Sequence, residues 1–387
     1  MVSIYIHIPF CKQKCYYCDF TSFSDKDNLI KEYIYSLIRE IEYSKLKYGL
    51  ESKEIETIYI GGGTPSYINE KYIEMLLNKI KKNFKIKQNA EITIEVNPDT
   101  IDANKVKKYR EIGINRVSIG LQSCNDLILK QIGRIHNYSQ FLETYSLLIE
   151  HGFDNINVDV MLGLPNQRLE SLVDTLNKII VLNPKHISCY SLILEECTKL
   201  YSLVNCPYNC DLNLNTIYNL PDDELERNMY WQTKKILESN GFIQYEVSNF
   251  AQRGYCSEHN VLCWRQNNYI GFGLNAHSYI ENKRFSNIDN IEQYILNINQ
   301  NQFEQNILIH ENQTQIDIMK EYMLLGLRLI DGVVIKEFYN RFNLKVEEIF
   351  DKQLKFLKDN NLIEIDKNVK LTSKGLDLAN VVWEEFV

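Results

Sequence analysis

The sequence lacks the excess of basic residues that is typical of proteins that bind nucleic acids. Lysine and arginine total 43 and aspartate and glutamate total 51, so the formal net charge is −8 at pH 7. The densest basic stretch, KIKKNFKIK from Lys79, is expected to be the solvated end of a helix. We therefore expect no nucleic-acid partner for this chain.

Long apolar runs and a targeting leader are also missing. The opening residues, MVSIYIHIPF, are too few to span a bilayer, and no charged segment, apolar core and cleavage site open the chain. We therefore expect a cytoplasmic protein in a reducing compartment, where its ten cysteines do not build a disulfide framework. Clustered cysteines then indicate metal binding or catalysis, and scattered ones are usually small buried hydrophobic residues.

Short apolar runs alternate with longer amphipathic segments over the first half of the chain. The apolar runs, nearly continuous in Val, Ile and Tyr, predict strands buried on both faces over residues 2–8, 56–61, 91–96, 115–121, 155–162 and 186–194. The segments between them, with apolar residues three and four apart, predict helices over 27–47, 69–84, 102–111, 138–151 and 168–181. Six such units predict parallel strands with right-handed crossovers. They are too few for a closed eight-fold barrel, and an open doubly wound sheet is the alternative.

The alternation stops after Leu194. A long irregular segment follows, then a helix over 222–240 and two strand-like segments over 242–251 and 267–286. Residues 313–387 show three helical patterns, with a turn-rich run before the third, and predict a small winged-helix module with a two-stranded wing. The loosely spaced thiols of the irregular segment are expected to be ordinary thiols and not ligands of an auxiliary cluster: Cys197, Cys206 and Cys210.

Three cysteines, Cys11, Cys15 and Cys18, follow the first predicted strand within eight positions. Three thiolates can hold three irons of a [4Fe–4S] cube and leave the fourth iron without a protein ligand. An open position of this kind distinguishes a catalytic metal site from a closed structural one. A structural zinc site completed by His7 or Asp19 is the alternative.

The C-x₃-C-x₂-C spacing after a first strand resembles that of the radical S-adenosylmethionine superfamily. The resemblance implies one [4Fe–4S] cluster whose fourth iron is chelated by the amino and carboxylate groups of S-adenosylmethionine. It implies reductive cleavage of that sulfonium to a 5′-deoxyadenosyl radical. It also implies a core that is a partial (β/α)₆ barrel, which selects between the two arrangements of the sheet.

Polar residues recur at the carboxyl ends of the predicted strands, where βα barrels build their active sites. The glycines of GGGTPS (61–66) let backbone approach a ligand, and the motif resembles the superfamily's glycine motif, which contacts the amino group of S-adenosylmethionine. Side chains in IEVNP, SIGLQS and NVDVMLGLP can bind ribose hydroxyls or an ammonium group, with a structural hydrogen bond as the alternative for each. An arginine in KQIGRIHN is a candidate for the cofactor carboxylate, and a tyrosine of the first strand can stack on adenine or sulfonium. The cofactor-binding candidates are therefore Tyr5, Gly62, Gly63, Thr64, Glu95, Gln122, Arg134 and Asp159.

Five motifs together resemble one subgroup of this superfamily over essentially the whole chain: YIHIPFC with its CDF ending, GGGTPS, EVNPD, RVSIGLQS and DVMLGLP. The subgroup contains oxygen-independent coproporphyrinogen III oxidases and heme chaperones. The oxidases carry an N-terminal arm and a fourth cysteine two positions after the third. Here we expect no arm, and Phe20 stands at the position of the fourth cysteine. These differences favour the chaperone branch.

The segment HNVLCW (259–264) resembles the HNxxYW element that the chaperone branch associates with heme binding, with Cys263 in place of the tyrosine. His259 and Cys263 are chemically suitable axial ligands of heme iron. His277 lies nearby in sequence, in a segment that departs from the usual glycine pattern at Asn275. These three residues are the heme candidates, and a buried, hydrogen-bonded histidine is the alternative for His259.

The resemblance implies three parts: a radical S-adenosylmethionine core over 1–215, a middle extension over 216–305 and a winged-helix-like module over 306–387. It implies a chaperone that holds heme and passes it to an acceptor hemoprotein, expected to be a membrane-associated respiratory enzyme, with a homodimer as an expected form. Oxidative decarboxylation of coproporphyrinogen III to protoporphyrinogen IX is the alternative. A DNA-binding regulator that uses IKEFYNRFNLK is a third class, which the acidic charge disfavours.

Overall fold

The computed structural model of the chain describes residues 2–205, 210–211, 216–309 and 313–387. Six parallel strands stand side by side in chain order at its centre. They are β1 (Val2–Ile8), β2 (Glu54–Gly62), β3 (Lys85–Val96), β4 (Arg116–Gln122), β5 (Asn155–Leu162) and β6 (His186–Ser191). The prediction of six parallel strands in a partial barrel is confirmed.

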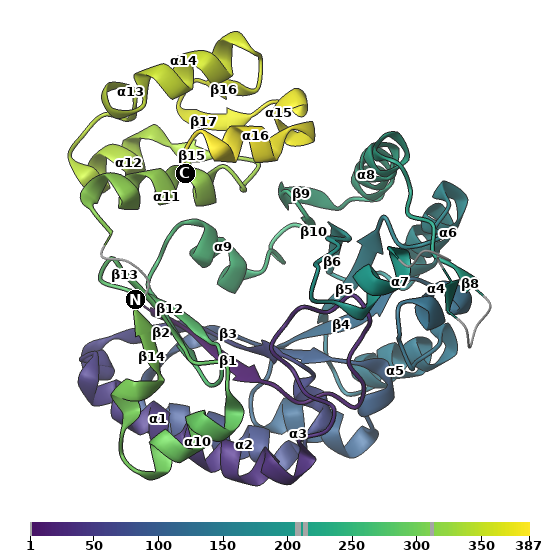
Figure 1. Cartoon of the computed structure of the whole chain (residues 1–387), viewed down its shortest axis with the longest axis vertical. Helices are drawn as coiled ribbons and strands as arrows, with labels where there is room; N and C mark the ends of the chain where they lie inside the picture. Colours follow the sequence, from purple (N-terminus) through teal and green to yellow (C-terminus); the bar gives the residue numbers. More distant parts are fainter. Residues whose placement is uncertain (1, 206–209, 212–215, 310–312) are drawn as a thin grey trace.

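Helices cover the outer face of this curved sheet, as Figure 1 shows. Those that connect the parallel strands are α1 (Ile30–Lys47), α2 (Glu70–Asn83), α3 (Ala103–Glu111), α4 (Asp126–Gln131), α5 (Tyr138–Glu150) and α6 (Leu169–Val181). Side-chain caps begin several of them; the Asn137 side chain, for example, forms a capping box with Gln140 at the start of α5. The sequence did not predict α4, because six residues span too few turns to show a helical period.

The central strands are buried on both faces, as their apolar runs predicted. All seven residues of β4 are buried, and so are six of the seven residues of β1. One cluster of buried apolar side chains extends from Val2 to Ile298 through the parallel strands and the helices that cover them. The strand ends are therefore held by a continuous core, and polar side chains on the inner face are exceptions that require a partner or a ligand.

The middle of the chain extends the same sheet at both edges. Antiparallel strands join the β6 edge: β10 (Asn249–Ala251) and β9 (Ile243–Glu246), which follow α8 (Asp223–Ser239). At the other edge β11 (Tyr269–Phe272) pairs parallel to β1, and β12 (His277–Ile280), β13 (Lys283–Asn287) and β14 (Ile307–Ile309) follow antiparallel, with α10 (Ile291–Asn299) before β14. The sheet thus has twelve strands in the described ranges, and its edge strands β14 and β9 do not pair with each other.

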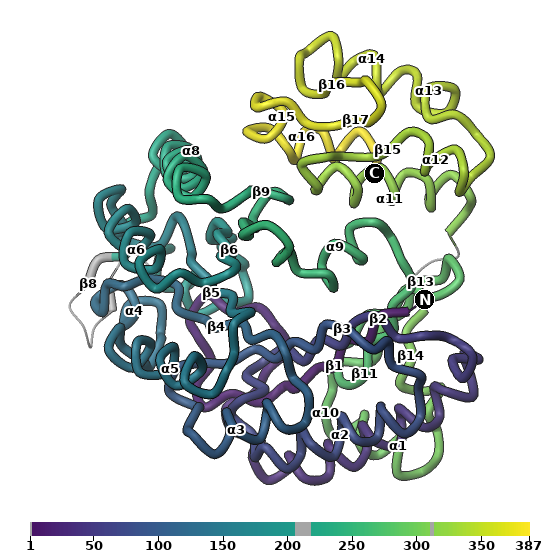
Figure 2. Tube along the Cα trace, turned by 180° about the vertical axis from the view of Figure 1, so that it is seen from behind, coloured from purple at the N-terminus to yellow at the C-terminus, as the bar shows by residue number. Residues whose placement is uncertain are grey.

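A short helix, α9 (Glu258–Trp264), lies on the inner side of the sheet, between the sheet and the C-terminal part of the chain (Figures 1 and 2). That C-terminal part has its own apolar core. It contains α11 (Gln315–Gly326), β15 (Val333–Val334), α12 (Ile335–Phe342), α13 (Val346–Ile349), α14 (Asp351–Asp359), β16 (Ile363–Ile365), β17 (Asn368–Leu371), α15 (Ser373–Asp377) and α16 (Ala379–Glu384). Arg328 joins the two parts, because its guanidinium lies over the rings of Trp264 at 4.4 Å and Trp383 at 4.8 Å.

Several predictions about local structure are wrong in detail. The wing has three strands, β15, β17 and β16, because a two-residue strand leaves no pattern in the sequence. The predicted strand over 186–194 ends at Ser191, and Leu192, Ile193 and Glu195 contribute to the wall of a cavity instead. The basic stretch from Lys79 covers both the end of α2 and the start of β3.

The described residues of the segment after β6 include regular structure, although the sequence predicted an irregular segment. It contains α7 (Lys199–Val204) and the short strands β7 (Cys210–Asp211) and β8 (Thr216–Ile217). Cys197 is exposed, and Cys206 lies outside the described residues. None of the described helices combines the length and the apolar character needed to cross a bilayer.

Candidate functional site

A cavity of about 500 Å³ lies on the inner side of the sheet and reaches the carboxyl ends of the parallel strands. Side chains from β2 to β6 line it together with the loop that follows β1. The predicted residues on its wall are Cys11, Cys15, Cys18, Gly62, Gly63, Thr64, Glu95, Gln122, Arg134 and Asp159. The structure therefore brings together, from six separate segments, nearly the whole set that the sequence proposed for the cluster and its cofactor.

The cysteine loop is tied to the sheet by backbone and side-chain contacts. The Cys11 N–H donates to the Phe23 carbonyl at 2.9 Å, which closes the loop on itself. The Thr64 hydroxyl donates to Cys11 Sγ and the Arg134 guanidinium donates to Cys15 Sγ, each at 3.5 Å. Two of the three sulfurs thus already accept hydrogen bonds from polar groups, as is usual for sulfurs that carry negative charge as metal ligands.

The protonation of these thiols depends on iron. Burial raises the pKa of the Cys11 thiol, and it raises the pKa of Cys18 to about 11. Metal ligation requires the thiolate and releases its proton, so binding of iron opposes this shift. The donor set of three thiols around one cavity wall therefore fits an iron–sulfur cluster.

The alternative of a zinc site completed by His7 is not supported by the contacts of this histidine. Its Nε2–H donates to the Thr21 carbonyl at 2.8 Å, and its Nδ1 pairs with the Tyr5 hydroxyl at 3.0 Å. Burial lowers its pKa to about 4, so the ring is neutral near pH 7. Both ring nitrogens already have hydrogen-bond partners, and neither is available to bind zinc. Asp19 lies in an exposed part of the loop. Among the residues that the structure describes, no three His, Cys, Asp or Glu side chains are placed to hold a single metal ion.

The glycine motif is packed directly against the cysteine loop. Gly62 has φ +112°, and a Cβ at this position would lie 2.5 Å from the His7 ring. A Cβ at Gly63 would lie 2.9 Å from the Ile8 carbonyl oxygen and 3.0 Å from Cys11 Sγ. Contact excludes a side chain at both positions, and at Gly62 the backbone conformation excludes it as well, so the backbone of the motif forms part of the cavity wall.

Glu95 is a buried carboxyl group at the end of β3. It accepts the Tyr59 O–H at 2.8 Å and the Gly62 N–H at 3.1 Å. Burial raises its pKa to about 7, against the effect of these two donors, and the nearby Asp159 carboxylate raises it further. Glu95 is therefore able to change its charge near neutral pH at the wall of the cavity.

Gln122 and Asp159 line the cavity and are held by further polar contacts. Gln122 has φ +73°, an uncommon conformation for this residue type, and its Oε1 accepts the Tyr190 O–H at 3.0 Å. Asp159 accepts the Asn157 side-chain N–H at 2.7 Å and the Ser118 hydroxyl at 3.3 Å, and burial raises its pKa. Both side chains are thus pre-positioned by neighbours before any ligand is present.

Arg134 and Tyr5 differ from the expectation in their surroundings. Besides Cys15, Arg134 donates to Asn97 Oδ1 at 2.8 Å and to the Gly120 carbonyl. It is a partly buried cation at the cluster loop, with several hydrogen-bond partners. Tyr5 does not line the cavity; its ring stacks on Tyr59 at 6.3 Å, one layer behind the wall.

The heme candidates do not form one group. His259 is buried in the first turn of α9, where its Nδ1 lies 2.8 Å from Thr57 Oγ1 of β2. Burial, with a contribution from the Arg116 guanidinium, lowers its pKa to about 3. Cys263 lies one turn further along α9, and burial raises its pKa to about 12.

His277 is exposed at the start of β12, which is three strands from β2, or about 14 Å at the usual strand spacing. The structure therefore separates His277 from His259, although the sequence places them close. Asn275, the departure from the glycine pattern, adopts φ +52° and donates to Thr21 Oγ1 at 2.8 Å. An asparagine thus takes the left-handed conformation and links the turn after β11 to the cysteine loop.

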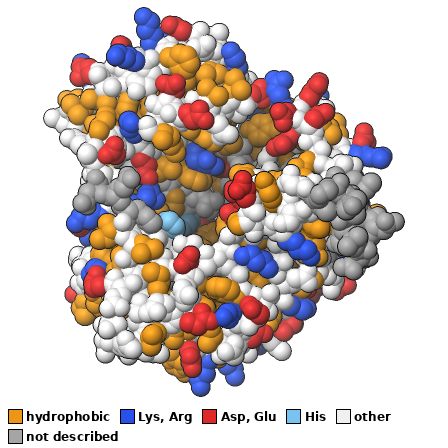
Figure 3. Space-filling model, viewed as in Figure 1, with side chains coloured by type: hydrophobic (Ala, Val, Ile, Leu, Met, Phe, Trp, Pro, Cys, Tyr) orange, Lys and Arg blue, Asp and Glu red, His pale blue; other side chains and the backbone are white. Residues whose placement is uncertain are grey.

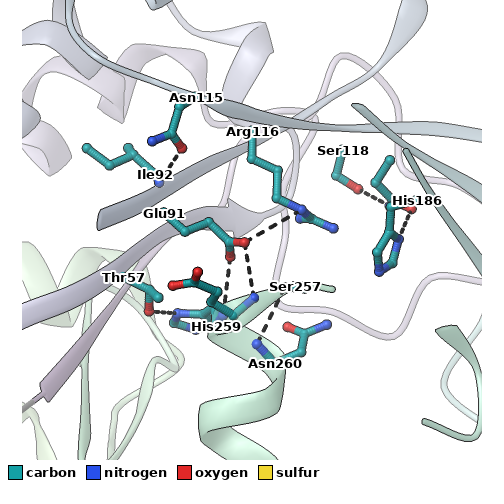
Figure 4. Close-up of polar contacts among 12 residues, drawn as sticks. Thr57, Glu91, Ile92, Asn115, Arg116, Ser118, His186, Ser257, His259 and Asn260 are labelled. Atoms are coloured by element: carbon teal, nitrogen blue, oxygen red, sulfur yellow. Dashed lines mark hydrogen bonds and ion pairs between the residues drawn. The ribbon is translucent and has the colours of Figure 1, made fainter. Parts of the chain in front are cut away.

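Sequence reasoning missed the polar group beneath α9 that Figure 4 shows. Glu91 of β3 accepts the backbone N–H of Glu258 at 3.0 Å and of His259 at 3.2 Å, and the Arg116 guanidinium lies 3.9 Å from it. Glu91 is two register positions before Thr93 and four before Glu95, so all three share one face of the strand. The signal available in the sequence was a polar residue at alternate positions of the strand, of which Glu91 is the first in EITIEV.

Comparisons with known proteins identify the family of this chain. The family model of the radical SAM superfamily matches residues 5–179, and that of the HemN C-terminal domain matches residues 313–378. The chain is 36% identical over its full length to the heme chaperone HemW of Bacillus subtilis, of which it covers 99%. It is 33% identical to the heme chaperone HemW of Lactococcus lactis, covering 100% of this chain and 97% of that protein. Among solved structures, coproporphyrinogen III oxidase (HemN) from Escherichia coli, a radical SAM enzyme, has a similar fold, with a TM-score of 0.83 and 22% identity over 100% of this chain and 89% of that one.

Proposed function

Because this chain belongs to the radical S-adenosylmethionine superfamily, and within it to the family of the heme chaperones named HemW, we propose that it binds heme and transfers it to hemoproteins. The observation that carries the proposal is similarity at 33–36% identity along the entire chain, from the cysteine loop to the C-terminal module. Such similarity covers α9 and the inner face of the sheet as well as the cluster loop.

Membership of the superfamily implies a [4Fe–4S] cluster and S-adenosylmethionine. We propose a single cluster with Cys11, Cys15 and Cys18 as its protein ligands. Two observations support this proposal: the three cysteines line the same cavity, and two of their sulfurs accept hydrogen bonds. When bound, such a cluster supplies an electron and an open iron position for a ligand. Gly62 and Gly63 let the backbone of the glycine motif pack directly against the cysteine loop, because a Cβ at either position would meet His7, Ile8 or Cys11.

The cavity residues can bind the two polar ends of S-adenosylmethionine. The Glu95 carboxylate would accept hydrogen bonds from an ammonium group or hydroxyls, and so would Asp159 at the neighbouring wall. Gln122 and Thr64 can add hydrogen bonds, and the partly buried Arg134 guanidinium supplies positive charge beside the loop for a carboxylate. The role of Tyr5 is indirect in this arrangement, since it supports Tyr59.

For heme, we propose His259 as the axial ligand. Its low pKa keeps the imidazole neutral and able to ligate iron at any physiological pH. Cys263 and His277 are second choices, because the first has a buried thiol with a raised pKa and the second lies three strands from β2.

The test is one anaerobic experiment on the reconstituted full chain. Heme is titrated by absorbance into wild type, His259→Ala and a control variant, His151→Ala, whose histidine bonds the Leu147 carbonyl on the distant α5. The complex is then mixed with an apo-hemoprotein to measure transfer. We expect saturable binding that His259→Ala weakens and His151→Ala does not. Absence of binding by wild type would refute the chaperone function.

A second function, oxidation of coproporphyrinogen III, is favoured by one observation, the match of fold to HemN over the full chain. The same preparation therefore receives coproporphyrinogen III, S-adenosylmethionine and reductant, and the products are separated by chromatography. Cys11→Ala shows whether any product depends on the cluster. A cluster-dependent vinyl product would establish the oxidase, and we expect none.

We also propose a membrane-associated respiratory enzyme as the acceptor, the cytoplasm as the location and a homodimer as the working form. The division of the chain at residues 215 and 305 stays a prediction.

Acidic and basic side chains are interspersed on the face that Figure 3 shows, which fits a protein without a nucleic-acid partner. Arg341, in the helix that a DNA-binding role would use, donates instead to the Gln266 carbonyl at 3.2 Å. Sedimentation with and without heme measures the oligomeric state.

A further inference from the structure

Arg116, the first residue of β4, places a second cation in the wall of the cluster cavity. Its side chain is only 2% exposed. Gly120, whose carbonyl accepts a hydrogen bond from Arg134, lies four residues further along β4, or about 13 Å at the usual rise of a strand. Arg134 therefore places positive charge beside the cysteine loop, and Arg116 places it at the amino end of the same strand.

The guanidinium of Arg116 has five N–H donors, and none of them donates a hydrogen bond to a residue that the structure describes. Its Nε is enclosed without a hydrogen-bond partner, whereas the side chain lines the cavity. Figure 4 shows the terminal nitrogens directed away from the Glu91 carboxylate. Buried polar groups normally have partners, so unused donors of a cation on a cavity wall indicate a ligand.

The neighbouring acidic side chains do not use these donors. Glu91 Oε2 lies 3.9 Å from Arg116 Nε, which is an ion pair but is longer than a hydrogen bond, and this carboxylate already accepts two backbone N–H groups of α9. Asp159 accepts hydrogen bonds from Asn157 and Ser118 instead. Glu91 therefore supplies a counter-charge on one side of the guanidinium, and the terminal nitrogens are left for a ligand.

We propose that Arg116 forms a binding subsite for a carboxylate group, which its two terminal nitrogens hold as a bidentate pair. The molecule that carries this carboxylate shares the cavity with S-adenosylmethionine, whose own carboxylate is proposed to lie beside Arg134. The inference goes beyond heme transfer and does not depend on it.

The shape and the charge of the subsite select a carboxylate. A guanidinium presents parallel N–H groups in a plane, and this arrangement matches the two oxygens of a carboxylate. A phosphate group would bring more than one negative charge to a wall that also carries Glu91, Glu95 and Asp159, and like charges at short range repel strongly inside a protein. A single negative charge is the one that this wall accommodates.

The test uses the full chain, reconstituted anaerobically and saturated with S-adenosylmethionine so that Arg134 is occupied. Saturation-transfer NMR measures the dissociation constants of propionate and of propionamide, which has the same shape without the charge. We expect propionate to bind about tenfold more tightly than propionamide. We expect Arg116→Gln to weaken propionate binding by about 30-fold and to remove this preference.

A tetrapyrrole is a second source of the same group, because its propionate side chains end in carboxylates. Iron-free protoporphyrin IX and its dimethyl ester are therefore titrated by fluorescence in a parallel arm. Binding of the free acid that Arg116→Gln weakens, with displacement of propionate, identifies a tetrapyrrole carboxylate. Binding of propionate without binding of the porphyrin identifies a small free carboxylate. Either result supports the subsite.

Arg284→Gln is the matched control. Arg284 is also a partly buried arginine with a carboxylate partner, Glu321, and it lies outside the cavity wall. Its replacement should leave the affinity for propionate unchanged, and thermal melting shows whether each variant folds. If Arg116→Gln does not fold because Glu91 loses its counter-charge, Arg116→Gln combined with Glu91→Gln removes both charges and takes its place in the titration.

A role of Arg116 as a counter-charge to Glu91 alone predicts lower thermal stability in Arg116→Gln without any effect on the preference for propionate over propionamide. That result would overturn the inference. Equal binding of propionate and propionamide by wild type, or no charge-dependent binding of either propionate or the porphyrin, would overturn it as well. None of these outcomes bears on heme transfer, which the experiment described above tests separately.

Discussion

If Glu95 binds S-adenosylmethionine as proposed, we expect its charge state to make the affinity depend on pH near neutrality. Burial, and to a smaller extent the nearby Asp159, raise the pKa of this carboxyl group to about 7, although the Tyr59 O–H at 2.8 Å stabilises the charged form. A ligand that needs the carboxylate as hydrogen-bond acceptor will bind more weakly as the pH falls and Glu95 takes up a proton.

The size of the effect follows from that pKa. With a value of about 7, the ionised fraction is about 0.9 at pH 8 and about 0.1 at pH 6, so affinity falls about tenfold over this range. Tyr59→Phe removes one donor to the carboxylate and should move the midpoint to higher pH. Glu95→Gln cannot ionise, so its affinity should be lower and should show only the pH dependence of the ligand itself.

The assay is isothermal titration of S-adenosylmethionine into anaerobically reconstituted protein at half-unit steps between pH 6 and pH 8.5. Glu95→Gln, measured in parallel, removes the contribution of the ligand's own titration. A difference between wild type and Glu95→Gln that does not vary with pH would refute the reasoning, because it would mean that Glu95 is ionised throughout or does not touch the ligand. If Tyr59→Phe leaves the pH midpoint of binding unchanged, only the stated effect of the Tyr59 hydrogen bond on the Glu95 pKa is refuted.

The raised pKa of Glu95 also makes the free energy of unfolding depend on pH. The folded-state pKa of about 7 lies above the ordinary value of 4.5, so between these values the folded protein binds more protons than the unfolded chain. The contribution of Glu95 to the free energy of unfolding is therefore present below pH 4.5 and is lost as the pH rises through 7. Comparison of urea unfolding for wild type and Glu95→Gln across this window measures the difference.

Two further predictions concern packing. Gly62→Ala places a side chain at φ +112° and against the His7 ring, at a cost of about 1–3 kcal/mol in backbone strain. We therefore expect less iron per chain after reconstitution, with the helical content retained. Full iron loading would contradict the packing argument. Arg328→Met keeps apolar contact but removes the cation above the Trp264 and Trp383 rings. We expect the free energy of unfolding of the C-terminal part, measured in urea, to fall by about 1–3 kcal/mol. An unchanged unfolding midpoint would show that these contacts do not join the two parts.

The parallel strands were predictable because each contains a short apolar run, and such a run indicates burial without any information about the rest of the chain. Helix α9 was not, because it is seven residues long and begins with Glu258 and His259, two polar residues. Its first N–H groups are satisfied partly by Glu91, which lies 167 positions earlier in the chain. No local pattern contains such a contact, although a charged residue on the inner face of β3 indicated that some partner was required.

The sequence by itself determined the spacing of the three cysteines, the order of the six strand–helix units and the polar residues at their ends, because spacing within one segment is set by covalent geometry and by the period of the backbone. Only the tertiary structure decided which of these residues meet. It placed His259 against Thr57, and it put His277 three strands away on a sheet extended by β11, a strand that pairs with β1 across more than 260 residues. The physical reason is that such contacts depend on which buried polar groups find partners once the core has closed, and that is a property of the whole chain.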